Sequence, residues 1–310
     1  MTFALKQRSL IKMLDSRNKS CHYSINTDWF LGFLEAEGTF LGDGCTPPAF
    51  ECSQHTSDYY MMSALKDWIG AGTLSINNPP GGNRTAVYTL RGRDALECKL
   101  APLFKKAPLT PKIEKQFLPW CSRYFPNSLP ALSSQKISGC WLAGFADGDG
   151  SFYTTIRNQD DYRIGFQFQA VFDLSQKAER GSRNSLLKLI HQQYFPDWEK
   201  ALIARVGLDG MDRLRLVSAP YLAQRCIPLF QGKLQSRKEI QLALFQEAVD
   251  FILAGQHLLV KNKRKIREFT KRCEWIQDRH SRKCQAEVNR ILLNRRLRAS
   301  GGKNSVGSPS

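Results

Sequence analysis

Alternating and helical spacings of apolar residues predict the same succession of elements in both halves of the chain. In the first half, two strands, a helix, two strands and two helices are expected at residues 39–43, 49–54, 58–69, 72–77, 85–91, 93–103 and 112–124. In the second half, the same order is expected at residues 151–157, 163–174, 185–194, 200–206, 212–217, 220–229 and 238–253. A short apolar helix precedes each series. The pattern therefore predicts an α+β fold of two pseudo-symmetric αββαββα repeats, each with a four-stranded antiparallel sheet and helices on one face.

The breaks between the two series predict the domain boundaries. Residues 125–135, FPNSLPALSSQ, are rich in Pro and Ser and lack a period, as linkers do. We expect an N-terminal repeat with a basic arm over 1–124, a C-terminal repeat over 136–255, and a basic C-terminal extension over 256–310. The helix-like run KNKRKIREFTKR in that extension either contacts phosphates or is a solvated charged face, and the final residues are expected to be disordered.

The two short helices that open the repeats share one pattern. Residues 29–40 read WFLGFLEAEGTF, and residues 141–152 read WLAGFADGDGSF. Each carries two small residues four positions apart, a spacing that lets two helix backbones approach closely. We therefore expect these helices to pack against each other. Such an internal duplication over about half the chain also argues for two repeats.

Both helices are expected to have defined ends. Thr27 or Asp28 is the candidate N-cap of the first helix, and Ser138 is that of the second. Gly38 and Gly150 are placed to stop each helix in the left-handed conformation.

The last acids before these glycines, Glu37 and Asp149, are the candidate functional pair. If the helices pack together, the two carboxylates project side by side and repel each other unless a cation lies between them. Hard oxygen ligands suit Mg²⁺, and paired Mg²⁺ ions promote phosphodiester hydrolysis. Solvated helix ends are the plainer interpretation of one such acidic stretch, but its repetition in the same glycine frame favours the metal site.

The two stretches resemble the LAGLIDADG motif of homing endonucleases. The motif is written here as FLGFLEAEG at Phe30–Gly38 and LAGFADGDG at Leu142–Gly150. The second copy is close to the family pattern, whereas the first has Phe for the opening Leu, Leu for the small second residue, and Glu for both acids. The resemblance implies a monomer whose sheets form a saddle on double-stranded DNA. It also implies that two or three Mg²⁺ ions are shared between Glu37 and Asp149, with Gly38 and Gly150 as further ligands.

The resemblance implies further active-site residues. In the family, a polar residue near the end of the second strand assists the water network, and the matching segments FECSQ and FDLSQ nominate Gln54 and Gln176. A Lys before the penultimate helix supports the same chemistry. Here LTPK nominates Lys112, while its counterpart LQSR, followed by Lys238, leaves Arg237 and Lys238 as alternatives.

Composition supports a polyanionic partner. The formal net charge is +17 and the pI is about 9.6, and no long apolar run or secretory signal points to a membrane. Arg and Gln at alternate strand positions are side chains that read base edges in the major groove. The candidate DNA-binding residues are Arg84, Arg91, Arg157, Arg163, Gln167, Gln169, Arg205, Arg213 and Arg215. A solvated sheet face is the alternative for any one of them, but the set favours a long, asymmetric DNA site.

Cysteine usage indicates an intracellular protein. The nine cysteines form no C-x-x-C pair and the five histidines are dispersed, so we expect reduced thiols and no zinc site. His55 is interpreted as an ordinary strand or surface histidine. The basic start MTFALKQRSLIKML also suits an organellar transit peptide, so chloroplast, mitochondrion and bacterial cytoplasm all remain candidate locations.

These observations predict a metal-dependent, intron-type DNA endonuclease with a site-specific target. The main alternative is an RNA-binding intron splicing maturase on the same scaffold, with intron RNA as its partner. A transcriptional regulator that binds DNA without nicking it is a third class.

Overall fold

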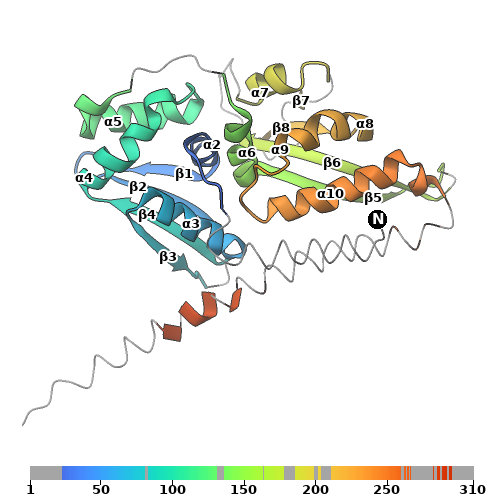
Figure 1. The fold of residues 1–310 in the computed structure, drawn as a ribbon, viewed down its shortest axis with the longest axis horizontal. Helices are drawn as coiled ribbons and strands as arrows, with labels where there is room; N and C mark the ends of the chain where they lie inside the picture. The colour runs from blue at the N-terminus through green and yellow to red at the C-terminus, as the bar shows by residue number, and fades with distance from the viewer. Residues whose placement is uncertain are drawn as a thin grey trace, which may run out of the picture.

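The computed structural model describes residues 23–80, 83–130, 136–162, 164–177, 186–198, 202–203 and 211–259, and some positions between 262 and 294. It confirms the predicted α+β fold of two repeats with antiparallel sheets (Figure 1). The elements of the first repeat are α2 Thr27–Glu37, β1 Gly38–Leu41, β2 Ala49–His55, α3 Tyr59–Ile69, β3 Thr73–Asn77, β4 Thr85–Arg91, α4 Arg93–Ala95 and α5 Leu118–Tyr124. Helical turns at Thr56–Asp58, Leu96–Leu100, Ala101–Lys106, Ile113–Phe117 and Pro126–Ser128 join or extend them.

The second repeat follows the same order. Its elements are α6 Gly139–Asp149, β5 Gly150–Asn158, β6 Phe166–Lys177, α7 Leu186–Tyr194, β7 Leu202–Ile203, β8 Met211–Leu216, α8 Ala219–Tyr221, α9 Ile227–Phe230 and α10 Lys238–Leu253. Helical turns lie at Leu222–Cys226 and Gln256–Leu258. The two sheets have equivalent strand orders, β1-β2-β4-β3 and β5-β6-β8-β7, and every pair is antiparallel.

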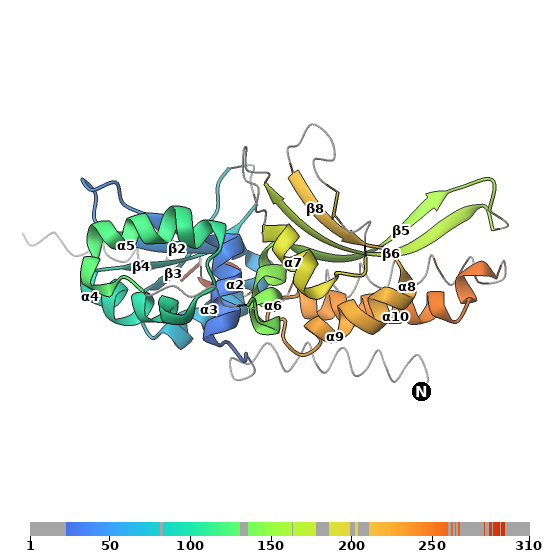
Figure 2. The same cartoon turned by 90° about the horizontal axis from the view of Figure 1, so that it is seen from above.

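Side chains along each strand point alternately to the two faces of its sheet, and one face packs on the core. In β4, Ala86, Tyr88 and Leu90 are buried, while the residues between them are only partly covered. In Figure 2, α8, α9 and α10 all lie on one side of the second sheet, and the face that points away from these three helices is called the open face below. One hydrophobic cluster runs through both repeats by way of α2 and α6. Each described helix is too short or too polar to cross a bilayer.

The helices α2 and α6 pack at very close range, as the small-residue spacing predicts. A Cβ built on Gly32 would lie 1.8 Å from the carbonyl oxygen of Trp141, and one on Gly144 would lie 1.9 Å from that of Trp29. A Cβ on Gly148 would lie 2.2 Å from the Cβ of Ala36. Only glycine fits at Gly32 and Gly144, because the backbones themselves are in contact there, and Gly148 leaves room for the Ala36 side chain.

The ends of these helices differ from expectation in two respects. The N-cap of α2 is Asn26, whose side chain accepts from the Trp29 N–H at 2.9 Å, so Thr27 and Asp28 were the wrong candidates. Ser138 caps α6 as predicted. Gly38 and Gly150 are extended, with φ of −78° and −88°, rather than left-handed.

These two glycines are needed for space instead of for a positive φ. A Cβ on Gly38 would lie 2.7 Å from the carbonyl oxygen of Leu34, and one on Gly150 would lie 2.7 Å from that of Ala146. The chain passes directly from each helix into the first strand of its sheet without an intervening loop.

Several predicted boundaries also shift. Phe125, the first residue of the predicted linker, is 1% exposed and its ring centroid lies 5.2 Å from that of Trp120, so it belongs to the core of the first repeat. Arg84 precedes β4 and is not a strand residue. Arg163, Arg205 and most of the run 261–272 lie outside the described residues.

Candidate active site between the two repeats

The acids Glu37 and Asp149 end α2 and α6, where these helices lie against each other. A Cβ on Gly148, the neighbour of Asp149, would lie 3.1 Å from Cγ of Glu37. The packing of the glycine faces therefore brings the two predicted acids together at the base of the helix pair.

Burial and charge repulsion perturb this pair. Burial, followed by the nearby Asp149 carboxylate, raises the pKa of Glu37 from 4.5 to about 7. Burial also raises the pKa of Asp149. Two neighbouring carboxyl groups with raised pKa values repel each other when both ionise, and a bound cation would offset this repulsion.

The raised pKa of Glu37 predicts that the metal-free protein loses stability as pH rises. An acid with an unfolded pKa of 4.5 and a folded pKa of about 7 favours folding fully below the lower value, and this contribution is lost as pH passes through the higher one. Wild type should therefore lose on the order of 3 kcal/mol relative to Glu37→Gln across this window. Denaturant unfolding in EDTA at several pH values measures the difference, and parallel stability curves would contradict it.

Two lysines cap the carbonyl ends of the motif helices in the same way. Nζ of Lys112 donates to the carbonyl of Gly38 at 2.8 Å and to two carbonyls in the last turn of α2 at 3.1 and 3.3 Å. Nζ of Lys238 donates to two carbonyls in the last turn of α6 at 2.9 and 2.6 Å. Burial lowers the pKa of both lysines, and both acids oppose that shift. Each helix end thus has its own buried ammonium group.

The geometry favours Lys238 over Arg237 as the counterpart of Lys112. Thr110 Oγ1 donates to Glu35, the first acid of the first motif, and Ser236 Oγ donates to Asp147, the first acid of the second. Each of these hydroxyl residues lies two positions before its lysine. The segments LTPK and QSRK therefore correspond, one position away from the match between LTPK and LQSR that the sequence suggested.

The first acid of each motif, which sequence reasoning left without a role, anchors a loop. Asp147 is fully buried and accepts from Nε1 of Trp29 at 2.8 Å and from two backbone N–H groups of the loop before α10 at 2.7 and 3.1 Å. Glu35 is 2% exposed and accepts from the Thr110 hydroxyl and from the Lys112 N–H at 3.1 Å. These acids hold the loops that carry the two lysines. In the sequence, the feature that could have pointed to this role is the position of each acid two residues before the last acid of its motif.

The tryptophans that begin the two motifs are not equivalent. Nε1 of Trp29 donates to Asp147, whereas Nε1 of Trp141 is buried without a partner among the described residues. Both rings stack on the Phe four residues later.

This difference predicts unequal effects of one substitution. Trp29→Phe and Trp141→Phe remove the same volume, but only the first also removes a hydrogen bond to a buried carboxylate. Trp29→Phe should therefore destabilise the protein by about 1–3 kcal/mol more than Trp141→Phe. Urea unfolding of both variants measures this, and equal losses would show that the bond contributes nothing.

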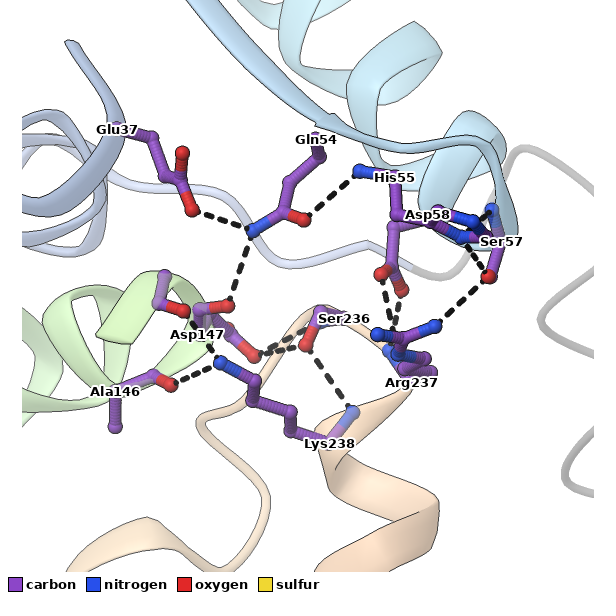
Figure 3. A network of polar contacts seen from close by, with 11 residues as sticks. Glu37, Gln54, His55, Ser57, Asp58, Ala146, Asp147, Ser236, Arg237 and Lys238 are labelled. Atoms are coloured by element: carbon purple, nitrogen blue, oxygen red, sulfur yellow. Dashed lines mark hydrogen bonds and ion pairs between the residues drawn. The ribbon is translucent and has the colours of Figure 1, made fainter. Parts of the chain in front are cut away.

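The candidate glutamines occupy matching strand positions. Each lies two residues beyond the strand residue that pairs with its cap glycine. Nε2 of Gln54 donates to Glu37 Oε1 at 3.0 Å and to the carbonyl oxygen of Asp147 at 3.4 Å (Figure 3). Gln176 is at the equivalent site on β6 and is partly buried. Gln54 therefore connects the second strand to the acid pair.

The donor set fits Mg²⁺ held together with a phosphate-bearing substrate. Among the described residues, no three His, Cys, Asp or Glu side chains group to form a metal cage. Mg²⁺ is commonly bound by one or two carboxylates with waters and substrate phosphates, rather than by a cage of protein ligands alone. Of the two predicted carbonyl ligands, that of Gly38 already accepts from Lys112 but retains a second lone pair.

The predicted DNA-binding residues divide between the sheets unequally. Strand register places five of them on the open face of the second sheet: Arg157, Gln167, Gln169, Arg213 and Arg215. On the first sheet, Arg91 lies on the open face with its NH2 3.7 Å from Glu51. Arg84, in the loop before β4, donates to Asn78 and Asn289.

One of these arginines is already held by a carboxylate. Arg215 donates from Nε and NH2 to the two oxygens of Asp173, both at 2.8 Å, and the Tyr153 hydroxyl donates to the same carboxylate at 2.7 Å. These bonds fix the guanidinium orientation on the open face. The sequence pattern did not predict this pairing.

Two antiparallel sheets arranged around a close-packed pair of glycine-bearing helices define the two-repeat LAGLIDADG fold. The structure is similar to that of the I-SmaMI LAGLIDADG homing endonuclease bound to cleaved DNA, with a TM-score of 0.64 and 20% identity over 80% of this chain and 97% of that chain. It is also similar to the I-AabMI LAGLIDADG meganuclease bound to uncleaved DNA, with a TM-score of 0.62 and 19% identity over 80% and 98%. By sequence, residues 142–249 match the LAGLIDADG endonuclease family.

Parts of the chain are also similar in sequence to curated endonucleases. The chain is 24% identical over 134 residues to probable intron-encoded endonuclease 4 of Neurospora crassa, covering 41% of this chain and 24% of that protein. It is 26% identical over 159 residues to the DNA endonuclease I-CreI of Chlamydomonas reinhardtii, covering 49% of this chain and 86% of that protein. The match thus spans about a quarter of the Neurospora relative.

Proposed function

We propose that this chain is a site-specific DNA endonuclease of the intron-homing type, which hydrolyses both strands of a long, asymmetric target with Mg²⁺. The observation that carries this proposal is the meeting of Glu37 and Asp149 at the ends of two backbone-packed helices. The names of its relatives, which include intron-encoded endonucleases, support it. Because both acids lie in one chain, the protein is proposed to act as a monomer.

The residues of the site have distinct roles in this proposal. Glu37 and Asp149 would hold two or three divalent ions, with Gly38 and Gly150 as further ligands. When bound, Mg²⁺ lowers the pKa of an attacking water and stabilises the leaving oxygen. Lys112 and Lys238 each place a positive charge beside one scissile phosphate, where negative charge increases during hydrolysis.

The surrounding elements deliver the substrate. Gln54 orients the Glu37 carboxylate, and Gln176 is proposed to act equivalently in the second repeat. The open sheet faces bind DNA through the arginines and glutamines named above, and the more basic second sheet makes the recognised sequence asymmetric. Arg163 and Arg205, which lie outside the described residues, are also proposed to bind DNA.

A cleavage selection tests the proposal directly. Purified protein is incubated with a library of long randomised DNA duplexes in Mg²⁺, and cut molecules are captured and sequenced. We expect one asymmetric sequence to be enriched, and EDTA to abolish its recovery. Intact DNA after exhaustive incubation in Mg²⁺ would overturn the proposal. Intact DNA accompanied by tight binding to intron RNA would favour a maturase.

A further inference from the structure

The two lysine-bearing loops carry different residues just before the lysine, and in the second loop that residue contacts the other repeat. The match of Thr110 with Ser236 and of Lys112 with Lys238 places Pro111 opposite Arg237. Arg237 belongs to the second repeat, yet its backbone N–H and its guanidinium contact the first. Pro111 has neither a backbone N–H nor a polar side chain, so it cannot make equivalent contacts.

Asp58 receives most of the contacts from Arg237. The backbone N–H of Arg237 donates to Asp58 Oδ1 at 2.7 Å, and its Nε lies 3.6 Å from Oδ2. Its NH1 also donates to the hydroxyl of Ser57 at 2.8 Å. The Asp58 side chain is 4% exposed and that of Arg237 is 35% exposed. The carboxylate end of this connection is buried, the guanidinium end is partly exposed, and the backbone hydrogen bond to the carboxylate is charge-assisted.

The connection continues to active-site groups on both sides (Figure 3). On one side, Arg237 lies between Ser236, which anchors Asp147, and Lys238, which caps α6. On the other side, Ser57 Oγ contacts His55 Nδ1, and the His55 N–H donates to Gln54 Oε1 at 3.0 Å. Displacement of Arg237 would therefore move the adjacent Lys238 directly, whereas Gln54 is linked to it only through Ser57 and His55 and keeps its own bonds to Glu37 and to the Asp147 carbonyl.

We propose that Asp58 and Arg237 are positioning residues for only one of the two cleavage centres, the one that uses Lys238. This inference rests on the proposed function. The Lys112 centre has Pro111 in place of the arginine and is held within its own repeat by Glu35. Cleavage of the two strands therefore depends on different positioning contacts. Loss of the Asp58–Arg237 ion pair leaves an enzyme that nicks one strand.

Strand-resolved kinetics test this inference. The substrate is a duplex that carries the sequence recovered from the randomised library, with a different label on each strand. Arg237→Gln and Asp58→Asn should each slow one strand by about 10- to 100-fold relative to the other, because small misplacements of catalytic groups have effects of that size. Lys238→Met should slow the same strand, and Lys112→Met the opposite one.

The controls separate positioning from folding. Arg225→Gln breaks an exposed ion pair with Asp197 in the same repeat and should leave both strand rates unchanged. Arg237→Lys keeps the positive charge and the backbone N–H, so it should recover part of the strand balance that Arg237→Gln loses. It serves as the test variant if Arg237→Gln folds poorly. Equal slowing of both strands, or none, would overturn the inference. If wild-type protein cuts neither strand, the proposed function itself fails.

Discussion

Replacement of Glu37 by Gln together with Asp149 by Asn is expected to abolish strand scission and leave DNA binding intact. The amides are nearly isosteric with the acids but cannot provide anionic metal ligands, and metal-assisted hydrolysis contributes several kcal/mol of transition-state stabilisation. We therefore expect cleavage to fall by at least about 10³-fold. Rates on the selected target and binding in EDTA give the two measurements.

The same variant should be more stable than wild type in the absence of metal. It no longer contains two buried, mutually repelling carboxylates, so its unfolding midpoint should rise while its activity is lost. Asp67→Asn, at an exposed acid paired with Lys66, is the matched control and should change neither property. Strand scission by the double variant at the wild-type rate would show that hydrolysis does not require these two acids.

Gly144→Ala is expected to cause the largest loss of stability of any single methyl addition to α6. Its Cβ would lie 1.9 Å from a backbone oxygen of α2, a clash that neither helix can relieve by a change of rotamer. The cost should reach or exceed about 3 kcal/mol, at the upper end of overpacking effects. Denaturant unfolding measures the loss.

The same helix provides a matched control. A Cβ on Gly139 would meet only the flexible side chain of Lys233, at 3.7 Å or more. Gly139→Ala should therefore be neutral or stabilising by up to about 1 kcal/mol, because Ala favours helix. A similar cost for both substitutions would mean that the contact between helices does not depend on Gly144.

The features that sequence predicted well were those written as periodic or repeated patterns. The spacing of small residues predicted the helix contact, because backbones can approach closely only where side chains are missing. Strand alternation predicted both four-stranded sheets, and β4 and α10 begin and end where the pattern placed them. Repetition of the acids led to the position of the candidate site.

The features that sequence missed depend on contacts between distant segments. Asn26 caps α2 because the chain arrives there in an extended conformation, which a preference scale does not reveal. Likewise, the correspondence of Lys112 with Lys238 becomes clear only when both ammonium groups are seen on helix carbonyls. Asp173 lies beside Arg215 through strand register, and Asp58 meets Arg237 across the repeats.

Each acid is followed directly by its cap glycine and the first strand of its sheet. In the proposed function, this connection fixes the distance between the cleaved bonds and the DNA bases that the strands contact. No loop separates Glu37 and Asp149 from the sheets, so the acids of the candidate site and the strands of the open faces form one rigid unit. Substitution of the strand side chains would therefore change the recognised sequence, while the distance from that sequence to the cleavage position stayed the same.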